Sequence, residues 1–176
     1  MDDSTPQNSI DTIAHNVPSL RVRLNRYAAS AATTPLSLET ECSQRDSMEL
    51  CVTNISESQV QISLTAEAPY ARRLDIATVQ LRRNRIKTSI LIILSSSENG
   101  TYAGQVIIPS REKIVEATTL ECQKLRRLSQ FDDSVINTLQ VSVSCASTNC
   151  RRAWVDAARS LSPDSPLREA IRKGLS

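Results

Sequence analysis

The fold is decided by residues 78–108, which read TVQLRRNRIKTSILIILSSSENGTYAGQVII. Apolar and polar residues alternate on both sides of the polar segment SSSENG at residues 95–100. This pattern predicts a strand, a turn and a second strand. Chains built from such hairpins fold as sandwiches or barrels, which most often present surfaces for binding.

The same alternation recurs along most of the chain. A first strand is expected from Leu20, where Leu20, Val22 and Leu24 alternate with polar residues. Further strands are expected at residues 36–42, 48–54, 60–66, 74–81, 86–94 and 101–108. The strands at 36–42 and 48–54 should pair or lie next to each other, because a short polar turn separates them. About seven to nine short strands predict a mostly β, antiparallel sandwich.

The last third of the chain mixes strand and helix signals. Residues 111–131 fit either a strand or an irregular amphipathic helix, with helical composition near 120–128. Residues 136–145 alternate and predict a final strand, whereas residues 152–160 and 166–173 predict two short helices. Ser165 is the expected N-cap of the second helix, and Pro166 is its first residue.

These elements divide the chain into three parts. Residues 1–19 are polar and aperiodic and are expected to form a flexible tail. Residues 20–146 are expected to form the β-sandwich domain, and residues 147–176 a helical C-terminal extension. No apolar signal segment follows Met1, which favours an intracellular protein; a piece of a longer secreted precursor is the alternative.

The composition restricts both the core and the chemistry. Hydrophobic residues make up 40% of the chain but aromatics only 3%, so the core must be aliphatic. Only 3 glycines are present, which argues against phosphate-cradling loops. The longest apolar run, residues 90–94, is too short to cross a bilayer, so a soluble protein without a membrane partner is expected.

The positive charges are mostly arginines, and they cluster, although the formal net charge is only +2. The clusters suggest a cationic binding surface, but acidic residues are interspersed and aromatics for base stacking are scarce. Paired arginines on solvent faces and loop ends are therefore the favoured interpretation. The candidate binding residues are Arg82, Arg83, Arg85, Arg126, Arg127, Arg151, Arg152 and Trp154.

The five cysteines leave several arrangements open. A disulfide between Cys42 and Cys51, or between Cys145 and Cys150, is expected in an oxidising compartment. A zinc site formed by these four thiolates is a weaker alternative, because their spacings are wider than usual for zinc ligands. Buried free thiols are the default. No metal or other cofactor is predicted.

The residues needed for catalysis are scarce in this sequence. The single histidine, His15, lies in the expected tail, and no nucleophile elbow or zinc-protease helix motif is present. The neighbouring Asp132 and Asp133 fit a turn or helix cap better than a pair of catalytic carboxylates. We therefore expect no enzymatic activity.

One block of sequence resembles a known structural class. A strand ending VTNIS at residues 52–56 is followed by alternating residues 60–64, the run TSILI at 88–92 and GTYAGQVII at 100–108. This order resembles immunoglobulin-like β-sandwiches of the fibronectin type III and major-sperm-protein-related class. The resemblance covers about a third of the chain and implies a fold rather than a function.

Comparison with true immunoglobulin domains adds two residues. In that resemblance, Cys42 stands for the earlier disulfide cysteine and Tyr102 for the corner tyrosine. Gly104 occupies the place of the second cysteine, so the usual disulfide between sheets is not expected. Tyr102 is expected either to anchor its loop by a hydrogen bond or to be a half-buried aromatic residue.

Two functional hypotheses follow. The first is a protein–protein interaction or assembly module that uses a sheet face or edge, with a copy of itself as one partner to consider. The second is a nucleic-acid-associated structural protein, similar to a small capsid or movement protein, that uses its arginine clusters. The C-terminal helices are expected to dock on the sandwich, with Trp154 as the anchor; insertion into a partner's groove is the alternative.

Overall fold

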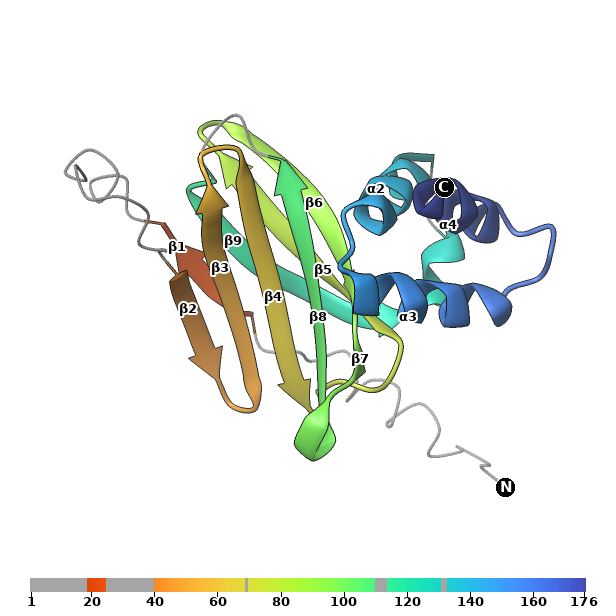
Figure 1. Cartoon of the computed structure of the whole chain (residues 1–176), viewed down its shortest axis with the longest axis horizontal. Coiled ribbons are helices and arrows are strands. Elements are labelled where there is room, and N and C mark those ends of the chain that lie inside the picture. Colours follow the sequence, from red (N-terminus) through yellow and green to blue (C-terminus); the bar gives the residue numbers. More distant parts are fainter. Residues whose placement is uncertain (1–18, 25–39, 69, 110–113, 131–132) are drawn as a thin grey trace, which may run out of the picture.

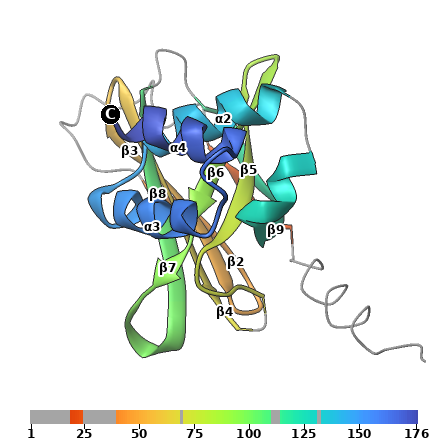
Figure 2. The same ribbon diagram turned by 90° about the vertical axis from the view of Figure 1, so that its right-hand side faces the viewer.

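The computed structural model of the chain describes residues 19–24, 40–68, 70–109, 114–130 and 133–176. The expected tail at residues 1–19 therefore lies outside the described residues except for Ser19, and of the strand expected at 36–42 only residues 40–42 are described. The described elements form three layers, two antiparallel sheets and a layer of helices (Figures 1 and 2).

The two sheets contain all the strands of the described residues. The four-stranded sheet has the order β1 (Arg21–Arg23), β9 (Glu116–Lys124), β5 (Asp75–Arg83) and β6 (Ile86–Ile93). The five-stranded sheet has the order β2 (Thr40–Arg45), β3 (Met48–Ser56), β4 (Gln59–Glu67), β8 (Thr101–Pro109) and β7 (Ser95–Ser96). The prediction that the second and third strands pair is confirmed, because β2 pairs with β3.

Period-two burial explains why these segments are strands. In β4 every second residue is buried and the residues between them are partly or fully exposed. The buried side chains of both sheets meet in one aliphatic core, as the composition predicts. Its fully buried members include Leu50, Val52, Ile62, Leu64, Val79 and Ile92.

The segment around residues 78–108 is only partly a succession of hairpins. One hairpin of this segment joins β5 to β6 through a tight turn in which Asn84 has a φ of 51°. The strands expected at 86–94 and 101–108 are present as β6 and β8, but they lie in different sheets. The chain crosses between the sheets through β7 and the short 3₁₀ helix η1 (Glu98–Gly100), where Gly100 has a φ of 72°.

The segment at residues 111–131, left open by the sequence, contains both a strand and a helix. Its first half forms β9, which pairs with both β1 and β5. Its second half forms the 3₁₀ helix η2 (Leu125–Gln130). A register shift between Thr78 and Val79 in the β5–β9 ladder explains why its apolar residues fit no single period.

The prediction of a final strand at residues 136–145 is wrong, because residues Asp133–Ser144 form helix α2. Leu139, Val141 and Val143 alternate as strand residues would, yet Val141 is 57% exposed. Leu139 and Val143, four residues apart, both lie on the buried side. A helix is favoured here because one of its faces is covered by helix α4 and by β6.

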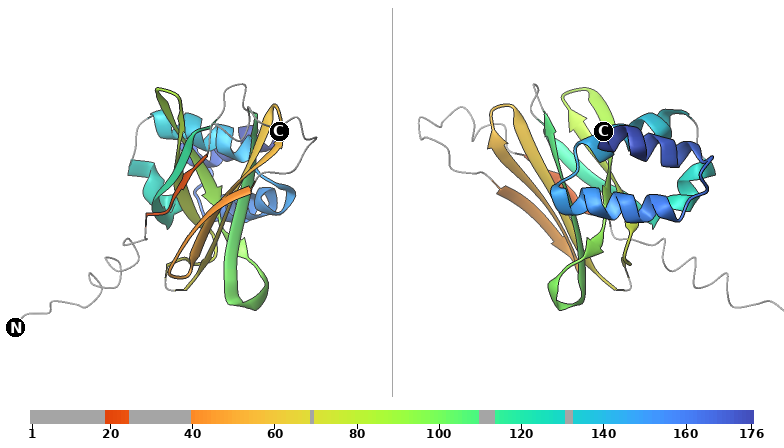
Figure 3. Two further views of the ribbon diagram at one scale, coloured as in Figure 1. Left: turned by 90° about the vertical axis from the view of Figure 1, so that its left-hand side faces the viewer. Right: turned by 45° about the vertical axis from the view of Figure 1, so that its right-hand side comes forward.

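The two predicted C-terminal helices are confirmed as α3 (Thr148–Arg159) and α4 (Pro166–Leu175). With α2 and η2 they cover the outer face of the four-stranded sheet near Ile76, Leu91 and Ile93 and form a second apolar core there. Trp154 is fully buried in this core, so the helices dock on the sandwich as expected. Figure 3 shows them as a layer beside the strands.

The helical layer also closes two sheet edges. The backbone N–H of Leu91, on edge strand β6, donates to Ser142 Oγ of α2 at 2.8 Å. The Cys145 carbonyl accepts a hydrogen bond from Ile107 N of β8 at 2.9 Å. Since these backbone groups are satisfied, the edges are protected from pairing with other chains. None of the helices in the described ranges is long and apolar enough to cross a membrane.

Candidate binding site

The part of the four-stranded sheet that the helices leave uncovered carries a lateral row of charged residues. Arg23 of β1 lies opposite Glu116 of β9, Glu116 opposite Arg82 of β5, and Arg82 opposite Lys87 of β6. Residues directly opposite each other in an antiparallel pair share one face of the sheet. With strands about 4.8 Å apart, the row is about 14 Å wide.

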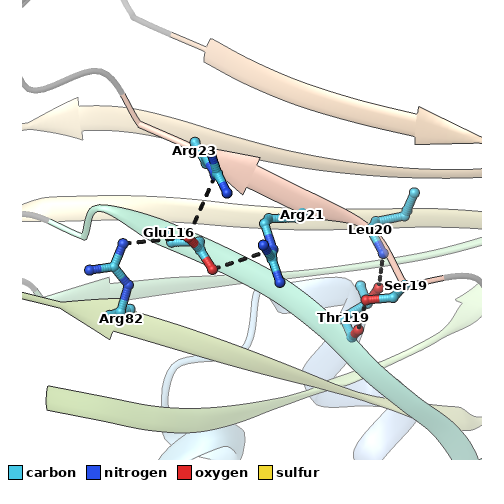
Figure 4. Close-up of polar contacts among 7 residues, drawn as sticks. All are labelled: Ser19, Leu20, Arg21, Arg23, Arg82, Glu116 and Thr119. Carbon is cyan, nitrogen blue, oxygen red and sulfur yellow. Dashed lines mark hydrogen bonds and ion pairs between the residues drawn. The ribbon is translucent and has the colours of Figure 1, made fainter.

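Glu116 is the centre of this row. Its carboxylate lies 3.4 Å from Arg21 Nε, 3.8 Å from Arg23 Nε and 3.4 Å from Arg82 Nη2. Figure 4 shows the three side chains approaching it from different sides. One carboxylate thus balances three guanidinium groups, and Lys87 adds a fourth positive charge. The row with Arg21 therefore carries four positive charges and one negative charge.

The first strand is held in place beside this row by a local set of hydrogen bonds. Leu20 N donates to Thr119 Oγ1 at 2.8 Å, and Thr119 N donates to the Leu20 carbonyl at 2.9 Å. Ser19 Oγ donates to the Thr119 carbonyl at 3.3 Å (Figure 4). Because Leu20 and Val22 are buried in the sandwich core, the intervening Arg21 must point to the outer face.

Arg82 is positioned by the end of the β5–β6 hairpin. Its Nη1 donates to the Asn84 carbonyl at 3.3 Å, across the tight turn, while Nη2 reaches Glu116. Its backbone carbonyl accepts from Val115 N at 2.8 Å, which holds the start of β9 against β5. The turn therefore places the guanidinium beside Glu116.

A second row, in which only Arg21 is charged, lies between the first row and the helices. From Arg21 of β1 it runs across the sheet through Thr118 of β9 and Gln80 of β5 to Ser89 of β6. The next residues toward the helices include Leu91, which is buried beneath α2. The candidate binding site is the area of these two rows, which we call the cationic face.

The ion pairs of the cationic face contribute little to folding. The arginine side chains are 38–75% exposed, and exposed ion pairs are worth about 0–1 kcal/mol. Their arrangement is better suited to an incoming anion, because the guanidinium groups remain accessible to solvent. Arginine also forms bidentate bonds to carboxylates and phosphates.

The predicted arginines are not gathered in one place. Arg82 belongs to the cationic face, and Arg85 is exposed in the adjoining turn. Arg83 follows the same strand but alternates to the other side of the sheet, and its Nε is buried without a hydrogen-bond partner among the described residues. Arg126 and Arg127 lie on η2, at the opposite end of β9 from Glu116.

The predicted binding residues on α3 either stabilise the helical layer or lie away from the cationic face. Arg151 donates from Nη2 to the Leu175 carbonyl at 2.6 Å and so holds the end of α4. Arg152 is exposed near the ion pair between Arg73 and Asp156, which is 3.5 Å long. Trp154 is buried and therefore unavailable as a surface anchor.

The four cysteines considered as zinc ligands are also separated. Cys42 and Cys51 form a disulfide between β2 and β3. Cys145 and Cys150 are free thiols, and Cys150 is buried, where its Sγ accepts from Gln105 N at 3.3 Å. The disulfide predicted for Cys42 and Cys51 is confirmed; the four-thiolate cluster is not formed by these residues.

Sequence reasoning did not assign Arg21, Arg23, Lys87 or Glu116 to a site. Arg21 and Arg23 alternate with core residues, and this spacing indicates that they share the solvent face of a strand. Glu116 had no comparable signal, since its neighbours in space lie 34 or more positions away in the sequence.

A polar cavity of about 260 Å³ lies between β7, β8 and the start of α3. Its lining includes Ser63, Thr65, Gln105, Asn149 and the Cys150 sulfur. These are hydrogen-bonding groups without a carboxylate or imidazole to act as a base for the thiol. The described lining thus suits polar contacts.

Comparisons with protein-family models, with curated proteins and with solved structures find no match to this chain.

Proposed function

We propose that the protein is a non-enzymatic protein–protein interaction module that binds an acidic segment of a partner on its cationic face. The observation that supports this most directly is the convergence of Arg21, Arg23 and Arg82 on the single carboxylate of Glu116. The side chains already form bonds to a carboxylate, so the carboxylates of a partner would find the same donors. Electrostatic complementarity of this kind favours specificity and fast association.

The shape of the face also suits an extended peptide. It is part of an open sheet surface with two rows of side chains, and the second row offers the amide of Gln80 and the hydroxyl of Ser89, while Thr118 between them and Arg21 is buried. A peptide lying along the charged row would place carboxylates near arginines and its backbone near these polar groups. Lys87 at the edge strand extends the positive charge to the rim of the sheet.

A nucleic-acid-associated structural role is the second candidate. The same row of cations would pair with phosphates, which supports this alternative. Base stacking would lack a partner there, because the described aromatic residues Tyr70, Tyr102 and Trp154 pack against the cores. We therefore favour an acidic protein segment over RNA or DNA.

We also propose that the sandwich is immunoglobulin-like. In that class one sheet has strands A, B, E and D, and the other has C, F and G, with C′ beside C in variable domains. The order β3-β4-β8-β7 corresponds to A, B, E and D, and β6-β5-β9 to C′, C and F. The N-terminal β1 would take the place of strand G, and β2 would be an addition beside strand A.

The proposed function is tested by direct binding to two polyanions. A labelled glutamate-rich peptide and a single-stranded RNA of equal length and charge are titrated with the protein at 50 and 200 mM salt. Tighter binding of the peptide supports the proposal. Tighter binding of RNA, with about a hundredfold loss over this salt range for four phosphate contacts, supports the alternative. Binding of neither ligand contradicts both.

A further inference from the structure

The outer face of the five-stranded sheet differs from the cationic face in its chemistry. Its outward positions on β2, β3 and β4 carry hydroxyl, amide and carboxylate groups and a disulfide, and no lysine or arginine. These described positions are Thr40, Cys42, Gln44, Glu49, Cys51, Thr53, Gln59, Gln61, Ser63, Thr65 and Glu67. Arg45, the last residue of β2, alternates to the other face of the sheet. A cation approaching the outer face would therefore meet no like charge among these outward side chains.

Cys42 and Cys51 lie directly opposite each other on this face, on β2 and β3. Their Cα atoms are 4.2 Å apart, and their sulfurs are joined in a disulfide. Cys42 is exposed and Cys51 is half-buried, on the outermost strand pair of the sheet. The bond is thus accessible to a thiol reductant, as labile disulfides are.

Glu49 lies two residues before Cys51 and on the same face of β3. A carboxylate oxygen of Glu49 and the sulfurs of Cys42 and Cys51 all lie within 4.8 Å of one another. None of the ion pairs formed by the described residues involves Glu49, so its carboxylate is not already neutralised by a cation. Two sulfurs and one carboxylate therefore form a compact group of three.

We propose that reduction of the Cys42–Cys51 disulfide converts this group into a binding site for a thiophilic divalent cation such as Zn²⁺. A dithiol reductant supplies the two electrons: its thiols become a disulfide while the bond between Cys42 and Cys51 breaks and each sulfur gains a proton. The metal then binds the two sulfurs as thiolates and releases those two protons. The oxidised pair cannot bind in this way because its sulfurs bear no negative charge.

The geometry needs only a small adjustment. In a tetrahedral zinc site with bonds of about 2.3 Å, two thiolate sulfurs are about 3.8 Å apart. The closely paired strands hold the sulfurs near each other, and the flexible Glu49 side chain supplies the third ligand. Two cysteines and one carboxylate leave the fourth position for water, as in zinc sites with three protein ligands. Ser63 of β4 lies opposite Cys51 and shares this face of the sheet.

The proposal excludes the other two candidate ligands. Cys150 is buried beside Gln105 and the Ile93 carbonyl, and Cys145 lies at the end of α2. The site therefore contains a pair of thiolates rather than four, and its affinity should depend on Glu49. This dependence separates it from adventitious binding of metal to any exposed thiol.

The experiment is a titration of the full chain with Co²⁺ under anaerobic conditions, before and after reduction by a phosphine. We expect one Co²⁺ per reduced chain, with a sulfur-to-cobalt charge-transfer band in the near ultraviolet, and displacement by Zn²⁺. Oxidised protein should show no band. Cys51→Ser or Cys42→Ser should abolish it, and Glu49→Gln should weaken binding by about tenfold or more.

Cys145→Ser is the matched control, because it removes a half-exposed thiol outside the site and should leave the band and the affinity unchanged. Circular dichroism of each variant verifies that it is folded. The proposal is overturned if the oxidised chain gives the same band, if Cys145→Ser abolishes it, or if Glu49→Gln binds Co²⁺ as tightly as the native protein.

Discussion

Gly104 of β8 packs directly against the backbone of Ile93 in β6, where the two sheets approach each other. A Cβ atom at position 104 would overlap the Ile93 carbonyl and lie 2.7 Å from Ile92 Cγ2. Real Cβ atoms do not approach other atoms this closely, so only glycine fits. The contact joins the sandwich core to the strand that supports the helical layer.

Replacing Gly104 with alanine should therefore destabilise the fold. We expect Gly104→Ala to lower the free energy of unfolding by about 1–3 kcal/mol, the usual cost of overpacking a core. Gly100→Ala is the comparison, because Gly100 has a φ of 72° but no atom near its missing Cβ. Urea denaturation of both variants measures the difference. A larger loss for Gly100→Ala would contradict the close-packing argument.

The helical layer should contribute strongly to stability through Trp154. This side chain is fully buried, and truncating such a residue costs about 3–5 kcal/mol. Trp154→Ala should therefore lower the melting temperature markedly. Val155→Ala, one position along the same helix but 36% exposed, should change the unfolding free energy by no more than about 0.5 kcal/mol. Equal effects at the two positions would mean that α3 does not dock on the sheet.

The cysteines should fall into two groups when their free thiols are counted. Under denaturing conditions without reductant we expect three free thiols, and five after reduction, because only Cys42 and Cys51 are paired. In the native protein, an alkylating reagent should modify Cys145 first, since Cys122 and Cys150 are buried. Mass spectrometry of the alkylated peptides identifies the sites. Five free thiols before reduction would contradict the disulfide.

The stability of the protein should fall at alkaline pH because of Cys122. Burial, and then the nearby Asp75 carboxylate, raise the pKa of this thiol from 9.0 to about 12. Below pH 9 the thiol is protonated in both states. Between pH 9 and about 12 the unfolded chain loses the proton first, so the free energy of unfolding falls, by at most about 1.4 kcal/mol per pH unit.

Cys122→Ala isolates this contribution from other groups that titrate in the same range. The difference in unfolding free energy between the native protein and the variant should be constant below pH 9 and should shift in favour of the variant above it. Denaturation curves at pH 8, 9 and 10 test this. A difference that does not change with pH would contradict the raised pKa.

Most strands were predictable because each buries only one face. In β4 the alternation of Val60, Ile62 and Leu64 with polar residues specifies both the strand and the side that faces the core. The crossover between β6 and β8 was not predictable, since a polar turn looks similar whether the next strand joins the same sheet or the other one.

Helix α2 shows the limit of reading periodicity alone. Leu139, Val141 and Val143 satisfy period two, and Leu139 and Val143 also satisfy the four-residue spacing of a helix. The helix is favoured by tertiary contacts, above all the close approach of Gly174 in α4 to the Gln140 carbonyl and to Val143. No local signal in residues 136–145 encodes that partner.

The candidate site was predictable only in part for a related reason. Arg82 belongs to a visible cluster of basic residues, but its alignment with Glu116 and Arg23 depends on the register of strands far apart in the sequence. That register includes the shift between Thr78 and Val79, which sequence periodicity does not reveal. The predicted binding residues therefore include one member of the row, Arg82, and several arginines that lie elsewhere.

The most direct test of the account compares three variants in their affinity for a labelled glutamate-rich peptide, measured by fluorescence anisotropy. Arg82→Gln should weaken binding about fivefold, equivalent to about 1 kcal/mol for an exposed ion pair. Glu116→Gln should strengthen it by a similar factor, because the competing carboxylate is removed. Arg152→Gln, an exposed arginine on α3, should change nothing. Equal weakening by Arg82→Gln and Arg152→Gln, or no gain from Glu116→Gln, would contradict binding at the cationic face.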